Sequence, residues 1–147
     1  MADPYDLARF VEAQDAGGTY SQALAELHRG RKVSHWMWFV FPQLAGLGRS
    51  ATARHYAISS LDEAREYLAH GVLGTRLREA SEAVAGLQGL SAERVFGSID
   101  AMKLHSSMTL FALAADDPDE VIFRRVLDQY FAGRTDPETT RLLALPE

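Results

Sequence analysis

The sequence has no cysteine, and this absence excludes several kinds of chemistry. Without thiols the chain forms no disulfide, carries no thiolate nucleophile and offers no thiolate ligand to zinc. No stretch approaches the roughly 18 apolar residues of a membrane span. The N-terminus also lacks the basic start and the apolar run of a signal peptide. We therefore expect a cytoplasmic protein that does not enter a membrane.

The chain also lacks an excess of positive charge. Its formal net charge is -5, which disfavours general nucleic-acid binding. One basic cluster stands out against this background, and its members are His28, Arg29, Arg31, Lys32 and His35. The cluster is either a solvated loop or a local site for an anion or an acidic partner.

Residues that typically begin and end helices recur along the whole chain, whereas no run of alternating apolar and polar residues predicts a strand. Caps and the spacing of apolar residues predict helices over 4–14, 19–29, 34–41, 49–57, 61–69, 72–87 and 98–115, a capped turn over 91–97, a helix opened by Asp117-Pro118 and a short one opened by Asp136-Pro137. The length of 147 residues fits one domain. We predict a compact all-α domain over 1–147, with about eight short-to-medium helices that do not form a regular four-helix bundle.

The usual chemical fingerprints are missing as well. The chain has no phosphate-binding glycine loop, no dinucleotide fingerprint, no zinc-protease motif and no nucleophile elbow. Its five histidines are not spaced as metal ligands. We predict neither a metal site nor a cofactor.

The stretch RKVSHWMWFVFPQLAGLGRS, residues 31–50, is the first of two unusual segments. A helix that is apolar all around is normally buried, so most of its aromatic residues are expected in the core. A tryptophan N–H, however, needs a partner and often lies at the edge of a pocket. The candidates for ligand contact here are His35, Trp36, Trp38, Gln43, Gly48, Arg49 and Ser50.

The stretch FGSIDAMKLHSSMTLF, residues 96–111, is the second. Its polar residues Asp100, Lys103, Ser106 and Ser107 interrupt an otherwise apolar helix, and Lys103 and Ser107 share one face. Two readings stay open. The serines bond to the preceding turn while Lys103 extends to solvent, or these residues line the same cleft as the aromatic stretch.

Together the two stretches resemble a small bacterial family known only as a domain of unknown function, some of whose members are labelled "calpastatin". The resemblance also covers YLAHGVLGTRL between them and implies an all-helical single domain, but it brings no reaction. The positions that match the family pattern are His35, Trp36, Trp38, Phe41, Pro42, Gln43, Gly48, Ser50, Lys103, Ser106 and Ser107. His105 departs from it, because an arginine is expected there.

Two functions are consistent with these observations. One is a pocket that binds or hydrolyses an anionic small molecule, such as a nucleotide or an ADP-ribose-like derivative, with His35, Asp100 and Lys103 as catalytic candidates. The other is a non-catalytic adaptor that docks a protein partner through the basic cluster, while the motif residues serve packing. The sequence leaves open whether the protein is an enzyme.

Overall fold

The computed structural model describes residues 3–144 and confirms the all-α prediction. The helices of this part are α1 (Ala8–Asp15), η1 (Ala16–Gly18), α2 (Thr19–Arg29), α3 (Met37–Val40), α4 (Ala51–His55), α5 (Leu61–Ala69), α6 (Leu73–Ala85), α7 (Ala92–Phe96), α8 (Ser98–Ala114), α9 (Val121–Phe131) and α10 (Pro137–Leu142). Residues 3–144 contain no strand, only one isolated parallel bridge between Leu44 and Ile58. No helix in this range has both the length and the apolar character that crossing a membrane requires.

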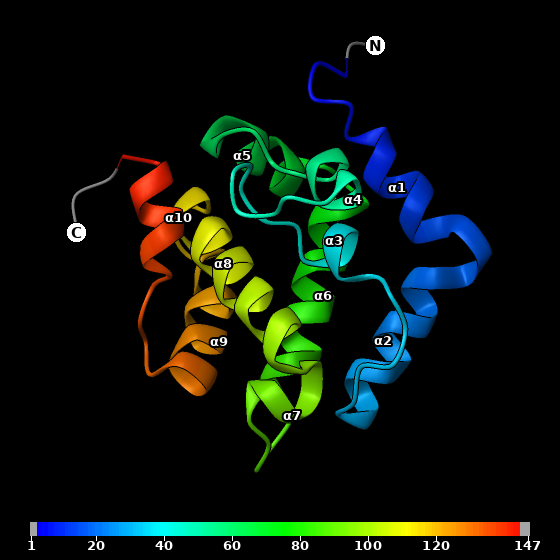
Figure 1. Cartoon of the computed structure of the whole chain (residues 1–147), viewed down its shortest axis with the longest axis vertical. Helices are drawn as coiled ribbons and strands as arrows, with labels where there is room; N and C mark the ends of the chain where they lie inside the picture. The colour runs from blue at the N-terminus through cyan, green and yellow to red at the C-terminus, as the bar shows by residue number, and fades with distance from the viewer. Residues whose placement is uncertain (1–2, 145–147) are drawn as a thin grey trace.

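Two helices organise the core. In Figure 1, α6 runs through the middle of the molecule, and it packs against α2 on one side and α9 on the other. The long helix α8 packs against α5, α7, α9 and α10. It is apolar around most of its circumference because it is covered from several directions, and Leu104, Met108 and Phe111 are fully buried.

Several predicted caps are confirmed. The side chains of Ser60 and Ser91 accept hydrogen bonds from the N–H groups of Glu63 and Arg94, at 3.1 and 3.2 Å. Gly30 ends α2 in the left-handed conformation with φ of 76°. Such a residue lets the chain leave a helix without the penalty that a Cβ would bring.

Other predicted boundaries were wrong, and each has a local cause. The N-caps of α2 and α8 are Gly18 and Gly97, so neither Thr19 nor Ser98 caps its helix. The first helix begins at Ala8 instead of residue 4, because Asp6 interrupts it with φ of 50°. The helix expected at Asp117-Pro118 begins only at Val121, after a turn over 117–120.

The helix predicted over 34–41 is much shorter, since α3 covers only Met37–Val40. The cause lies in Ser34, whose backbone N–H and hydroxyl both donate to the carboxylate of Glu26, at 2.9 and 2.5 Å. These bonds hold Ser34 in a loop that runs from the end of α2 to the start of α3.

Candidate functional site

Glu26 of α2 organises the loop that carries the basic cluster. Its side chain is buried at 1% exposure, and Oε1 accepts hydrogen bonds from the N–H groups of Val33 and Ser34 and from Trp36 Nε1, at 2.7, 2.9 and 3.0 Å. Burial by itself raises the pKa of this carboxyl, but the hydrogen bonds from Ser34, Val33 and Trp36 outweigh it and lower the pKa to about 2. Glu26 is therefore a buried anchor that fixes the start of the aromatic stretch.

The lowered pKa of Glu26 predicts that the free energy of unfolding decreases at acid pH. The folded pKa of about 2 lies below the ordinary 4.5, so the contribution is complete above about pH 4.5 and is lost as the pH falls toward 2. A difference of this size corresponds to roughly 3 kcal/mol. We expect the gap in unfolding free energy between wild type and Glu26→Gln, measured by urea denaturation, to shrink progressively over this range. A gap that stays constant from pH 5 to 2.5 would contradict the assignment.

Trp36 lies in the core. It is 0% exposed, its N–H is satisfied by Glu26, and its ring packs near Phe41 and Phe96, with centroids at 6.2 and 6.5 Å. The expectation that most of this stretch is core thus holds for Trp36. No part of its surface is available to a ligand.

Trp38 and Lys103 meet although they are far apart in the sequence. Trp38 is half-buried, and the Nζ atom of Lys103 lies 5.1 Å from the centroid of its ring. This cation–π contact joins α3 to the first turns of α8. The contact confirms that the two unusual stretches are neighbours in space.

Asp100 connects both lysines of the chain. The sequence contains only Lys32 and Lys103, and their Nζ atoms lie 2.9 and 3.6 Å from the two carboxylate oxygens of Asp100. The side chains of Lys32, Asp100 and Lys103 are 7%, 21% and 22% exposed. The cluster carries a formal charge of +1 in a chain whose net charge is -5.

Lys32 is fixed in this cluster from several directions. Its backbone N–H donates to the carbonyl of Val95 at 2.7 Å, and its Nζ donates to the carbonyl of Ser34 at 2.6 Å. Nζ also lies 5.0 Å from the centroid of the Trp36 ring. Lys32 was predicted only as a member of the basic cluster, and no spacing in the sequence relates it to Asp100.

The adjacent residues Ser106 and Ser107 of α8 have different environments. Ser106 Oγ lies 2.8 Å from Asp136 Oδ2 and 3.1 Å from the carbonyl of Met102, so it ties the start of α10 to α8. Ser107 lies one turn beyond Lys103, is 0% exposed, and its hydroxyl has no hydrogen-bond partner in the described chain. A buried hydroxyl without a partner costs about 1–3 kcal/mol, so Ser107 is the unusual one.

The residues from Gln43 to Ser50 form a loop that packing largely explains. The backbone of Gln43 accepts from the N–H of Ile58 at 2.9 Å, and Ser50 caps α4 by accepting from Ala53 N at 3.0 Å. A Cβ on Gly48 would lie 2.5 Å from the Cβ of Ala53, so glycine is needed for this close approach. Arg49 is exposed, and within residues 3–144 its side chain takes part in no hydrogen bond or ion pair.

His35 and His105 have different environments. His35 is exposed, and its side chain makes no hydrogen bond or ion pair with the rest of the described chain. His105 stacks on Phe131 at a centroid distance of 4.2 Å and places Nε2 2.8 Å from the carbonyl of Arg134. Among residues 3–144, no group of three or more histidine or acidic side chains could hold a metal ion.

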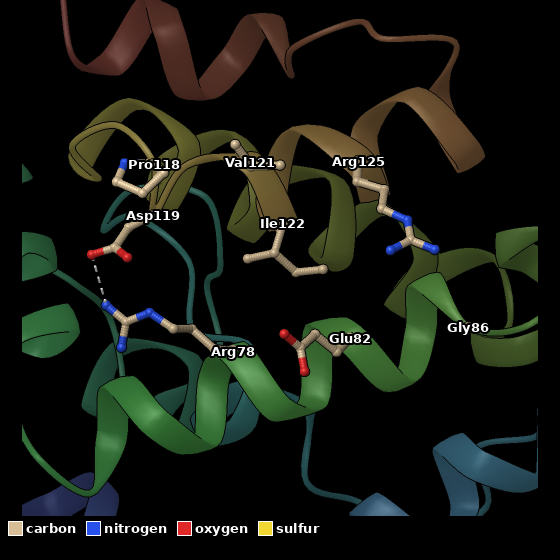
Figure 2. Close-up of a pocket in the computed structure, with 8 residues that line it drawn as sticks. All are labelled: Arg78, Glu82, Gly86, Pro118, Asp119, Val121, Ile122 and Arg125. Carbon is tan, nitrogen blue, oxygen red and sulfur yellow. Dashed lines mark hydrogen bonds and ion pairs between the residues drawn. The ribbon is translucent and has the colours of Figure 1, made fainter.

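The hollows that the structure shows lie elsewhere. One is a groove of about 590 Å³ between α6 and α9, shown in Figure 2. Further hollows lie along α9, between the N-terminal segment and α5, and at the ends of α5 and α8. None of the candidate residues lines these hollows, so a cavity at the aromatic stretch stays a prediction.

Residues 4–143 match the family described as "Protein of unknown function (DUF1810)", and the chain belongs to this family. The chain is also similar to a solved structure, the conserved hypothetical protein Rv1873 from Mycobacterium tuberculosis. The two share 51% identity over 98% of this chain and 100% of that one, with a TM-score of 0.92. No curated protein matches the chain.

Proposed function

We propose that the chain binds an anionic small molecule with a planar ring, of the nucleotide or ADP-ribose-like class, where Trp38 meets Lys103. The observation that carries the proposal is the pairing of both lysines with one carboxylate beside a half-exposed indole. Asp100 holds Lys32 at 2.9 Å but Lys103 only at 3.6 Å, so Lys103 is the ammonium group that can contact an anion. A partly exposed cationic site in an acidic protein favours an anion.

The neighbouring groups supply the remaining features of such a site. The exposed part of Trp38 offers a flat surface for stacking, since every planar base has a π-face. Ser107 lies on the same helical face as Lys103, but it is 0% exposed, so its hydroxyl, which has no partner within residues 3–144, does not reach a ligand at the surface. Of the catalytic candidates, Asp100 and Lys103 lie in this cluster, whereas His35 is not bonded to it.

Lys103→Gln should separate binding from folding. We expect the affinity for ADP-ribose or a nucleotide to fall at least 10-fold, because the charge-assisted contact is lost. Stability should change by less than about 1 kcal/mol, because the ion pair is partly exposed and Lys32 remains with Asp100. Isothermal titration calorimetry gives the first quantity and thermal unfolding the second.

Arg94→Gln is a matched control, since Arg94 is an exposed residue of α7 with no side-chain partner within residues 3–144. It should leave both quantities unchanged. If the folded wild type binds none of the ligands at millimolar concentration, the proposal is lost.

A second candidate is an adaptor that docks an acidic protein through the basic cluster. The exposure of His28, Arg29, Arg31 and His35 favours it, together with Val33, which is 66% exposed between them. Lys32 is excluded from this surface because Asp100 already binds it. Charge reversal by Arg29→Glu and Arg31→Glu should abolish salt-sensitive partner capture, and unchanged capture would remove this candidate.

A further inference from the structure

Side chains of both charges line the groove between α6 and α9. In Figure 2, Arg78 and Glu82 lie along α6 and Gly86 is its C-cap, and Ile122 and Arg125 face them from α9. Residues 78, 82 and 86 are spaced four apart, so they lie on one face of the helix. The groove is thus a continuous trough that none of the proposed ligand-binding residues lines.

One end of the groove is closed by an internal ion pair. Arg78 lies 3.3 Å from Asp119, and its guanidinium also donates to the carbonyl of Leu68 at 3.4 Å. The Nε atom of Arg78 is buried and has no partner in the described chain. This end therefore carries no net charge but keeps one unsatisfied donor.

The other two charges do not pair with each other. Glu82 on α6 and Arg125 on α9 line the same groove, yet within residues 3–144 neither side chain forms an ion pair. Figure 2 shows the carboxylate of Glu82 rising toward α9 and the guanidinium of Arg125 descending toward Gly86. A simple anion would be attracted by Arg125 but repelled by Glu82, whereas a molecule with both charges satisfies both side chains.

The α9 wall of the groove next to these charges is apolar. In Figure 2 Ile122 lies opposite Glu82, and Val121 beside it is 58% exposed. Gly86 leaves room below Arg125, although its φ of -75° suits any residue and an added Cβ would come no closer than 3.4 Å to the backbone of Glu82. Packing therefore does not require glycine at this position.

We propose that this groove binds a small zwitterion with an apolar body, which is the chemistry of a free apolar amino acid or a short apolar peptide. Glu82 receives the ammonium group, Arg125 receives the carboxylate, and Ile122 and Val121 contact the apolar body. The site is separate from the one formed by Trp38 and Lys103, so either can fail without the other.

Amide chemical shifts during titration test the proposal. With L-leucine or leucyl-leucine, the ¹H–¹⁵N signals of Gly86, Ile122 and Arg125 should move in a saturable manner, and the tighter ligand identifies which source fits. N-acetyl-leucine lacks the ammonium and leucinamide lacks the carboxylate, so each should bind at least 5-fold more weakly than leucine. Equal binding of all the probes, or no shift at 50 mM, overturns the proposal.

Substitutions assign the two charges. Glu82→Gln and Arg125→Gln should each weaken leucine binding at least 5-fold, and both should fold normally because these side chains are exposed. The same changes outside the groove, Glu93→Gln and Arg94→Gln on α7, should leave binding intact. Gly86→Ala narrows the groove and should also weaken binding. If the α6 and α9 variants bind leucine as the wild type does, the assignment is wrong.

Discussion

Replacing Trp36 with alanine should lower the free energy of unfolding by about 4 kcal/mol, in the range for a large aromatic side chain removed from a core. The indole is 0% exposed and packs near Phe41 and Phe96, so the substitution leaves a cavity that the surrounding rings cannot fill. For a chain of this length the loss corresponds to a fall in melting temperature of roughly 10 °C. Urea unfolding followed by far-ultraviolet circular dichroism measures it independently of tryptophan fluorescence.

Trp38→Ala is the matched control for this prediction. Trp38 is only half-buried, so its removal exposes less new apolar surface and should cost less than half as much. Equal losses at the two positions would mean that Trp38 is also a core residue and would weaken its assignment to a ligand site.

Glu26→Ala should have an effect of similar size, about 4 kcal/mol. The substitution removes the acceptor of one buried donor, the indole N–H of Trp36, and of two partly buried donors, the N–H groups of Val33 and Ser34. Hydrogen bonds to a charged group contribute about 1.5–3 kcal/mol each, and donors left unsatisfied add to the loss. Urea denaturation at pH 7 measures the change.

Glu12→Gln provides the control for this prediction, since Glu12 is exposed on α1 and should be neutral. The double variant Glu26→Ala, Trp36→Ala should lose clearly less than the sum of the two single losses, because the partners share one hydrogen bond. Strict additivity would contradict the view that Glu26 and Trp36 act together.

The helical class could be predicted from the sequence because caps and apolar spacing are local signals. Ser60 and Ser91 cap the helices that follow them, since a serine before a helix can bond to an N–H within its own turn. Thr19 and Ser98 are also residue types that favour the N-cap position. In the structure, however, the N-caps are the preceding residues Gly18 and Gly97, which have positive φ values. Local pattern alone does not distinguish these cases.

The site could be predicted only in part. The proximity of the two stretches was inferred from their unusual polar residues, and the contact between Trp38 and Lys103 confirms it. Glu26 was missed because its spacing looks like that of an ordinary surface glutamate on an amphipathic helix. The one available signal was its position three residues after Ala23 and next to Leu27, both of them on the buried face.

The role of Lys32 depends on tertiary structure alone. Its pairing with Asp100 arises because the backbone of Lys32 bonds to Val95 of α7, immediately before α8 begins. No periodicity relates Lys32 and Asp100, because helices α3 to α7 separate them in the sequence. The sequence predicted most of the aromatic stretch as core and kept both tryptophans as candidates for ligand contact. The structure buries Trp36 and leaves Trp38 partly accessible, a difference that depends on tertiary packing.

A direct measurement of the proposed binding uses the scarcity of lysine. In ¹⁵N-labelled protein, the side-chain ammonium region can contain only the signals of Lys32 and Lys103. During titration with ADP-ribose we predict a saturable shift of the Lys103 signal, and its loss in Trp38→Leu. If both ammonium signals stay fixed at millimolar ligand in the folded wild type, the Trp38–Lys103 cluster is not a binding site for this class of molecule.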